Sequence, residues 1–271
     1  MKFITLEGDR VPALGFGTWM LRGEGCRDAV ADAIRIGYRH IDTAEIYGNE
    51  TEIGWALAES GIPREEFFVT SKIWWDHLRY RDAVKSAEES IQRLGTQYLD
   101  LLLIHWPNEE VPLEEPLRAL QKLKHDGKAR HIGVSNFTLE LLGISLRLAR
   151  LACIQVEYHP LIDQSALVRM TQQNGLMLTA YSPLARGEVE KQPVLQEIGR
   201  RYGKTPAQVS LRWLMQQRRV AAIPKASSAE HRRANFQVFD FELSVEEMER
   251  IAALGRGRRV VDEAFSPNWG P

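Results

Sequence analysis

Eight short apolar runs recur along this 271-residue chain, and a longer amphipathic segment follows most of them. Several of the runs are apolar at consecutive positions, which is typical of strands buried on both faces of a parallel sheet. Most of them are also too short to form a helix. We therefore predict eight strands, at residues 13–17, 40–42, 67–71, 99–105, 129–135, 154–157, 176–181 and 220–223.

The segments between these runs carry apolar residues three to four positions apart, the spacing of one face of an α-helix. Val84, Ala87, Ile91 and Leu94 show this spacing, and Gly95 follows them as a stop signal. We predict helices at residues 28–36, 50–60, 81–94, 117–123, 138–148, 165–174 and 206–217, and a last one at 245–253.

This alternation, with no Pro-, Gly- or Ser-rich linker, predicts an α/β protein with one domain over residues 1–271. A (β/α)8 TIM barrel is the simplest way to close eight parallel strands. The alternative is an open doubly wound sheet. Residues 15–20 read Gly-Phe-Gly-Thr-Trp-Met, however, and lack the third glycine of the dinucleotide-binding fingerprint of that fold.

Both ends of the chain add elements to the barrel. Residues 3–6 and 11–12 are short alternating runs that flank Gly8-Asp9, which predicts an N-terminal β-hairpin. After the C-terminal helix, residues 255–271 combine arginines with Phe265 and Trp269. This tail is too polar for the core and too aromatic for a linker, so we expect it to lie across the barrel mouth.

Charge and cysteine content exclude several classes of protein. The 35 Lys and Arg nearly balance the 36 Asp and Glu, which argues against a protein that binds nucleic acid by neutralising phosphates. Cys26 and Cys153 form no CxxC motif, so we expect neither a disulfide framework nor a metal site. The first ten residues carry early charge and no apolar core, which predicts a cytoplasmic protein without a membrane partner.

Polar residues stand at or just after the ends of three successive predicted strands. They are Asp42, Tyr47 in the following loop, Lys72 and His105. Each has an ordinary explanation alone, as a helix cap, a surface tyrosine, a solvated lysine or a core histidine. In a TIM barrel, however, the carboxyl ends of the strands meet at the mouth that carries function. Their coincidence there predicts a catalytic site.

The chemistry of these four residues is that of a proton donor. A tyrosine hydroxyl has a pKa near about 10, and a neighbouring ammonium lowers that pKa. A buried Lys72 needs a carboxylate to stay charged, and Asp42 can supply it. His105 can donate a hydrogen bond to a carbonyl oxygen. The set contains no nucleophile–base pair or metal cage, so a cofactor is expected to bring the second reactant, and hydride is the natural candidate.

Three long motifs strengthen this interpretation. Residues 37–50 read GYRHIDTAEIYGNE, residues 70–74 read TSKIW and residues 100–107 read DLLLIHWP. From Gly17 to about Asn235 the chain resembles the aldo-keto reductases, and within them the shorter bacterial 2,5-diketo-D-gluconic acid reductases. The resemblance implies that Tyr47 is the general acid, that Asp42 and Lys72 tune its pKa, and that His105 orients the carbonyl.

The resemblance also implies that NADP(H) binds across the barrel mouth without a Rossmann fold. Lys225 would pair with the 2′-phosphate. Many relatives carry an arginine where this chain has His231, although Arg232 or Arg233 could compensate, so we expect NADPH with NADH as the alternative. The matching cofactor positions are Gly17, Thr18, Trp19, Asp42, Ser135, Asn136, Gln155, Tyr181, Ser182, Leu184, Ile223, Lys225, Ala226, Ser227 and Asn235.

By the same resemblance, tryptophans would wall the substrate pocket. The substrate residues would be Trp19, Tyr47, Trp74, His105, Trp106 and Trp269. The function expected is NADPH-dependent reduction of small aldehydes, dicarbonyls or keto-sugar acids by a monomer. Two alternatives stay open at this stage. One is a non-catalytic NADP(H)-binding structural or sensing module, and the other is a barrel hydrolase that uses Glu157.

Overall fold

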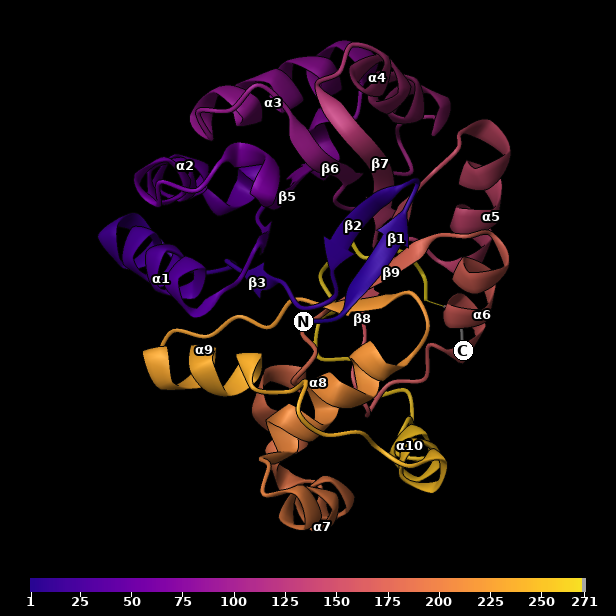
Figure 1. Ribbon diagram of the computed structural model, residues 1–271. Coiled ribbons are helices and arrows are strands. Elements are labelled where there is room, and N and C mark those ends of the chain that lie inside the picture. The colour runs from indigo at the N-terminus through magenta and orange to yellow at the C-terminus, as the bar shows by residue number, and fades with distance from the viewer. Residues whose placement is uncertain (270–271) are drawn as a thin grey trace.

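The computed structural model of the protein describes residues 1–269, and its centre is an eight-stranded parallel sheet with the strands in chain order (Figure 1). The segment just before the first strand of this sheet pairs with its last strand and closes the sheet into a barrel. Leu14 forms a parallel bridge with Ala222, and the Gly15 amide donates to the Ala222 carbonyl over 2.9 Å. The predicted barrel is therefore confirmed. Its strands are β3 (Phe16–Gly17), β4 (His40–Asp42), β5 (Phe68–Ile73), β6 (Leu99–Ile104), β7 (Ala129–Ser135), β8 (Cys153–Glu157), β9 (Met177–Tyr181) and β10 (Val220–Ala222).

Helices surround this sheet in a ring (Figure 1). The eight predicted helices are present, and α1 begins five residues earlier than predicted. Two further helices, α7 and α9, were not predicted. Their bounds are α1 (Gly23–Ile36), α2 (Glu50–Glu59), α3 (Tyr80–Arg93), α4 (Glu114–His125), α5 (Leu139–Leu148), α6 (Ser165–Gln173), α7 (Pro193–Tyr202), α8 (Pro206–Gln216), α9 (Ala229–Phe236) and α10 (Val245–Ala252).

Local sequence explains where two of these helices begin. Thr205 and Ser244 are the N-caps of α8 and α10, and each accepts a hydrogen bond from the backbone amide three residues later. The side chains of Gln208 and Glu247 bond back to the cap amides and complete two capping boxes. These reciprocal bonds satisfy backbone donors that a helix start otherwise leaves open.

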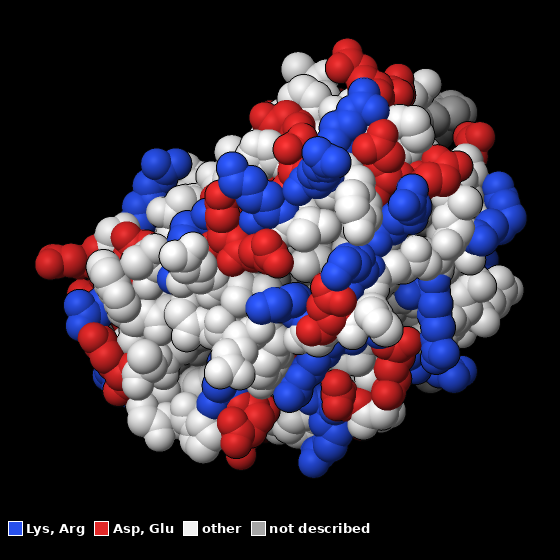
Figure 2. Space-filling view, turned by 90° about the horizontal axis from the view of Figure 1, so that it is seen from above, with Lys and Arg blue, Asp and Glu red and all other residues white. Residues whose placement is uncertain are grey.

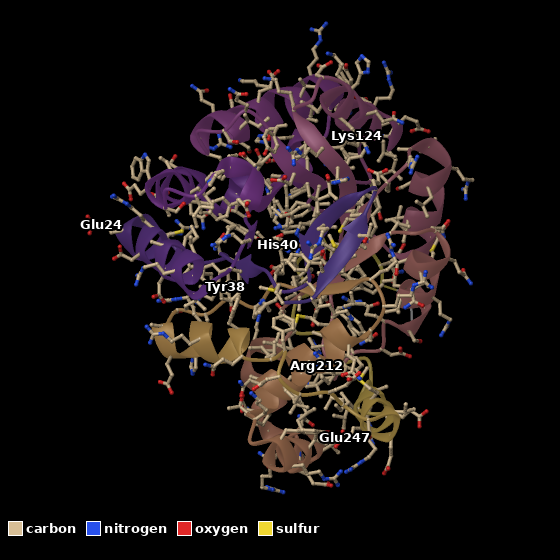
Figure 3. All side chains as sticks on the ribbon, viewed as in Figure 1. Glu24, Tyr38, His40, Lys124, Arg212 and Glu247 are labelled. Carbon is tan, nitrogen blue, oxygen red and sulfur yellow. The ribbon has the colours of Figure 1, made fainter. Side chains whose placement is uncertain are left out.

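The predicted hairpin covers the N-terminal end of the barrel. Strands β1 (Phe3–Leu6) and β2 (Asp9–Pro12) are antiparallel and lie across the barrel in Figure 1. His40 is labelled near the centre of the barrel in Figure 3, and its ring nitrogen Nδ1 lies 3.1 Å from the carbonyl oxygen of Pro12. His131 lies 2.9 Å from both Glu7 and Asp9. With this end covered, a functional cavity has to open at the other end.

The tail runs over that opposite end. The buried carboxylate of Glu157, the last residue of β8, accepts hydrogen bonds from the amides of Val260 and Val261. The ring of Phe265 packs against Trp74 and Trp106, each at 5.3 Å between centroids. Residues 255–269 thus lie across the mouth as predicted, and residues 270–271 lie outside the described part of the chain.

The outer surface carries charges of both signs. Figure 2 shows Lys and Arg interspersed with Asp and Glu over the face that it presents, in agreement with the formal net charge of −1. Within residues 1–269, no helix combines the length and apolar character that a membrane crossing requires.

Candidate active site

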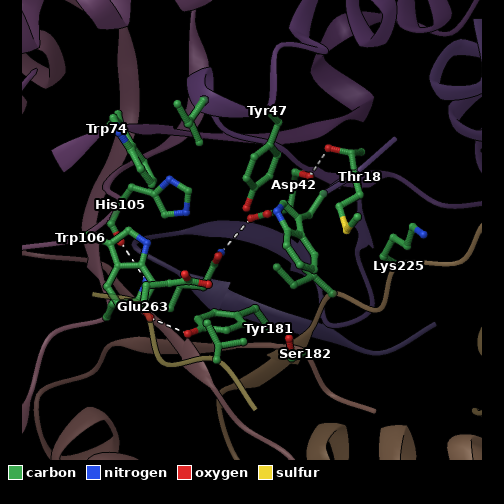
Figure 4. Close-up of a pocket in the computed structure, with 18 of the residues that line it drawn as sticks. Thr18, Asp42, Tyr47, Trp74, His105, Trp106, Tyr181, Ser182, Lys225 and Glu263 are labelled. Carbon is green, nitrogen blue, oxygen red and sulfur yellow. Dashed lines mark hydrogen bonds between the residues drawn. The ribbon is translucent and has the colours of Figure 1, made fainter. Parts of the chain in front are cut away.

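A cavity of about 360 Å³ opens at the carboxyl ends of the strands, between the barrel and the tail (Figure 4). Most of the residues that the sequence singled out lie in its wall, although they come from many separate segments. The predicted residues that line it are Gly17, Thr18, Trp19, Asp42, Tyr47, Trp74, His105, Trp106, Asn136, Gln155, Tyr181, Ser182, Ile223 and Lys225.

Some predicted residues do not line this cavity. Lys72 lies behind Asp42, and the Trp269 ring packs on Trp106 with a centroid distance of 6.2 Å. The others are Ser135, Leu184, Ala226, Ser227 and Asn235. Conversely, sequence reasoning missed several lining residues, which come from loops and from the tail. These are Met20, Arg22, Ile46, Arg186, Val261, Glu263 and Phe265, while Pro183 lies within the predicted cofactor segment 181–184 and also lines the cavity.

A buried ion pair lies at the base of the cavity. The ammonium of Lys72, whose side chain is 1% exposed, donates to Asp42 Oδ1 over 2.6 Å and to the carbonyl of Thr43 over 2.7 Å. The other Asp42 oxygen accepts from Gln155 Nε2 over 2.7 Å. Burial lowers the pKa of Lys72, and the adjacent carboxylate opposes this shift. The sequence prediction that Asp42 pairs with Lys72 is confirmed.

Tyr47 is held on the short 3-10 helix η1 (Glu45–Tyr47) that follows β4. The Glu45 carboxylate fixes this turn by accepting from the Trp74 amide and the Ser86 hydroxyl. Lys72 Nζ lies 5.2 Å from the centre of the Tyr47 ring. Burial raises the pKa of Tyr47, and the charge of Asp42 adds to the rise. The lowering that we expected from the ammonium is therefore wrong for this structure, because desolvation of the phenolate outweighs it.

His105 follows β6 and stands edge-on to Tyr47, at 5.7 Å between ring centroids. Burial and the charge of Lys72 hold the pKa of His105 well below its usual value. The ring is therefore neutral at physiological pH. It can donate one hydrogen bond, while Tyr47 keeps the proton that is available for transfer. Within residues 1–269, the buried His105 Nδ1 has no hydrogen-bond partner.

The opposite wall contains a flat aromatic ring and amide groups. Tyr181 ends β9, and its hydroxyl donates to Asn136 Oδ1 over 2.6 Å. Asn136 Nδ2 in turn donates to the His105 carbonyl over 2.9 Å. Asn136 has a φ of 62°, in the left-handed region that asparagine tolerates better than most residues. This chain of contacts links the Tyr181 ring to the backbone beneath His105.

The ammonium of Lys225 lies at the end of the cavity away from His105, next to Thr18 in Figure 4. Lys225 Nζ donates to Ser227 Oγ over 2.7 Å. The guanidinium of Arg232 is buried, pairs with Asp32 over 2.7 Å and donates to the carbonyls of Ala226 and Ser227. Nε and Nη1 of Arg232 thus already hold Asp32 and the loop, which leaves less of this guanidinium for a phosphate than an exposed arginine offers. Arg233 and His231 are exposed.

The sequence model of the Aldo/keto reductase family matches residues 13–256, which is most of the chain. The chain belongs to the aldo-keto reductase family. It is 38% identical over 265 residues to methylglyoxal reductase DkgB of Escherichia coli O157:H7, covering 96% of this chain and 99% of that protein. It is 43% identical over 258 residues to glyoxal reductase of Bacillus subtilis strain 168, covering 94% and 92%.

Solved aldo-keto reductase structures share the whole fold. A crystal structure provisionally assigned to a 2,5-diketo-D-gluconic acid reductase B has a TM-score of 0.96 at 42% identity, over 100% of this chain and 98% of that one. The aldose reductase of Schistosoma japonicum has a TM-score of 0.92 at 35% identity, over 98% of each chain. The family resemblance drawn from the sequence is thus confirmed, and the family is one of oxidoreductases.

The hydrolase alternative loses its candidate residue. Both oxygens of Glu157 accept hydrogen bonds from the tail, and Oε1 also lies 2.9 Å from His159 Nε2. Neither Glu157 nor His159 is among the residues that line the cavity. The Glu157 carboxylate therefore anchors the tail and has no access to a substrate in that cavity.

Proposed function

We propose that this aldo-keto reductase is an NADP(H)-dependent carbonyl reductase with Tyr47 as its general acid. The observation that carries the proposal is the convergence of a protonated phenol, a neutral imidazole and a buried ammonium–carboxylate pair on one cavity. Tyr47 combines a phenolic proton with a position beside His105.

The residues around the cavity fit a nicotinamide dinucleotide. Tyr181 offers a flat ring for stacking, and Asn136 and Gln155 offer amide groups to a carboxamide. At the other end, Lys225 offers a point charge to a phosphate. Gly17, Thr18, Trp19, Ser182 and Ile223 would line the path between them. We propose that Ser135, Leu184, Ala226, Ser227 and Asn235, which lie outside the cavity wall, complete the binding surface.

The proposed mechanism separates the two hydrogens that a carbonyl gains. The hydride for the carbonyl carbon would come from NADPH held by the residues named above. His105 donates a hydrogen bond to the carbonyl oxygen and so fixes the orientation of the substrate. Tyr47 gives its phenolic proton to that oxygen as negative charge develops there. An alkoxide is a stronger base than a phenolate, so this transfer is favourable even though burial raises the pKa of Tyr47.

The Lys72–Asp42 pair acts after the proton has left. The phenolate that Tyr47 becomes is disfavoured by burial, and a cation near the ring stabilises it. Asp42 keeps the ammonium oriented, with two of its three hydrogens used by Asp42 and Thr43. The ammonium therefore lowers the cost of losing the proton, while the pKa of the resting phenol stays above its ordinary value because of burial and the charge of Asp42.

The proposed substrates are small aldehydes and dicarbonyls, with keto-sugar acids as a further class. The support comes from relatives described as methylglyoxal and glyoxal reductases and from the aromatic wall of Trp19, Trp74 and Trp106. We propose that Trp269 contributes through its packing on Trp106. We further propose a cytoplasmic monomer, a location consistent with the two free, buried cysteines.

Replacing Tyr47 by phenylalanine tests this function. Reduction of methylglyoxal with NADPH should fall by about 100-fold or more, because a positioned general acid commonly contributes that much. Quenching of cofactor fluorescence on binding should persist, since the substitution removes one hydroxyl from the cavity. Unchanged turnover would remove Tyr47 from the role of acid. Absence of turnover by the wild-type protein across a broad carbonyl panel would favour a non-catalytic NADP(H)-binding module.

A further inference from the structure

Two anchors fix the tail over the substrate end of the cavity. Glu157, whose side chain is fully buried, accepts hydrogen bonds from the amides of Val260 and Val261. The second anchor is Phe265, whose ring stacks on Trp75 with planes 16° apart and also meets Trp74 and Trp106 edge-on. The segment between these anchors is therefore held across the mouth.

Glu263 lies between the anchors, and its side chain extends into the cavity between Trp106 and Tyr181 (Figure 4). A small turn fixes its backbone, because the Glu263 amide donates to Ser266 Oγ over 2.8 Å and the Ser266 amide donates back to the Glu263 carbonyl. Within residues 1–269, its carboxylate makes no hydrogen bond or ion pair with the protein. The cavity thus contains one acidic group that the mechanism does not use.

Besides Glu263, the charged side chains that line the cavity are Arg22, Asp42, Arg186 and Lys225. Lys225 lies at the end next to Thr18, away from His105 in Figure 4, and Arg186 lies over the Trp19 ring at 5.3 Å. Asp42 is neutralised by its pair with Lys72. Arg259, which is near the tail, lies 3.7 Å over the Trp269 ring and faces Glu157, and it does not line the cavity. Of the two carboxylates that line the cavity among the described residues, Glu263 is therefore the one without a cationic partner.

We propose that Glu263 is a specificity-determining residue that disfavours carbonyl substrates bearing a carboxylate. This inference rests on the proposed function and narrows it, from the three substrate classes above to neutral aldehydes and dicarbonyls. A second negative charge beside Glu263 is repelled, and because Glu263 is exposed, solvent and salt screen part of that repulsion. Lys225, at the opposite end from His105, remains available for a phosphate of the cofactor.

A matched pair of aldehydes isolates this effect. 4-Formylbenzoate is anionic at neutral pH, and 4-formylbenzamide is neutral with nearly the same shape. The quantity to measure is the ratio of their kcat/KM values with saturating NADPH. Glu263→Gln should raise the ratio of the anionic to the neutral substrate about tenfold, an effect typical of removing one nearby like charge. Glu263→Asp, which keeps the charge, should leave the ratio closer to that of the wild type.

Glu249→Gln is the control, because it removes the same charge from exposed helix α10, outside the cavity. Its ratio should equal that of the wild type. If the ratio is unchanged in Glu263→Gln while the amide is still reduced, the inference is overturned and the proposed function stands. An equal rise of the ratio in Glu263→Gln and Glu249→Gln has the same meaning. If the wild type reduces neither aldehyde, the proposed function fails and the inference fails with it. Added salt should raise the wild-type ratio more than that of Glu263→Gln, because screening weakens repulsion.

Discussion

Replacing Lys72 by methionine should expose the cost of a buried, unpaired carboxylate. Methionine retains an unbranched chain of similar length but no charge, so Asp42, whose side chain is 3% exposed, keeps only the Gln155 amide as a donor. Removing one partner of a buried ion pair typically costs about 3–5 kcal/mol. For a chain of this size, 1 kcal/mol corresponds to about 2 °C. We therefore expect K72M to melt about 6–10 °C below the wild type.

The assay is a double-mutant cycle followed by thermal and urea unfolding. It compares the wild type, K72M, D42N and the double variant D42N/K72M. Asp42→Asn removes the charge that Lys72→Met would leave unpaired, so the double variant should be more stable than the sum of the single losses implies, by at least about 1 kcal/mol. Additivity of the two losses to within about 0.5 kcal/mol would refute the reasoning. It would mean that burial does not couple these charges.

Two further perturbations test the packing of the barrel and the protonation state of the site. Gly54→Ala in α2 should destabilise the protein by about 1–3 kcal/mol, since its Cβ would lie 2.5 Å from the Leu94 carbonyl oxygen. Gly25→Ala in α1, where no atom lies within 4 Å of the new Cβ, should stabilise the protein by up to about 1 kcal/mol in denaturant unfolding. If both substitutions changed the free energy of unfolding in the same direction, this account would be contradicted. The pKa of His105 lies well below 6.5, so the ring stays uncharged as pH rises from about 6 to about 8. The pH profile of carbonyl reduction should therefore contain no transition due to His105 in that range. A transition that is present in the wild type and absent in His105→Gln would contradict this prediction.

Local sequence patterns were sufficient to predict the strands and most of the helices. Runs of consecutive apolar residues mark strands buried on both faces, and apolar residues three to four positions apart mark the buried face of a helix. Both patterns can be read directly from the sequence. Helices α7 and α9 were missed although α7 has Pro193 at its start and Gly203 in the left-handed region at its end. In α9 the side chains buried against the barrel include Arg232 and Asn235, so its apolar periodicity is weak.

The candidate site divides along the same line. Asp42, Tyr47, Lys72 and His105 could be named from the sequence because strand ends and long motifs mark them. The role of Arg232 could not, since its partner Asp32 is 200 residues away. Glu263 was missed for a similar reason, because the tail has no periodic pattern that shows which of its side chains faces the barrel.

The amino-acid sequence by itself determined the number and order of strands, the hairpin and the residue types of the proposed catalytic group, because these depend on local periodicity and on chemistry carried within single segments. Tertiary structure alone decided that Leu14 meets Ala222, that Glu157 anchors the tail, and that Tyr47 becomes a weaker acid than an exposed tyrosine. The physical reason is that desolvation and pairing depend on which distant segments surround a group, and no neighbouring residue in the chain specifies that environment.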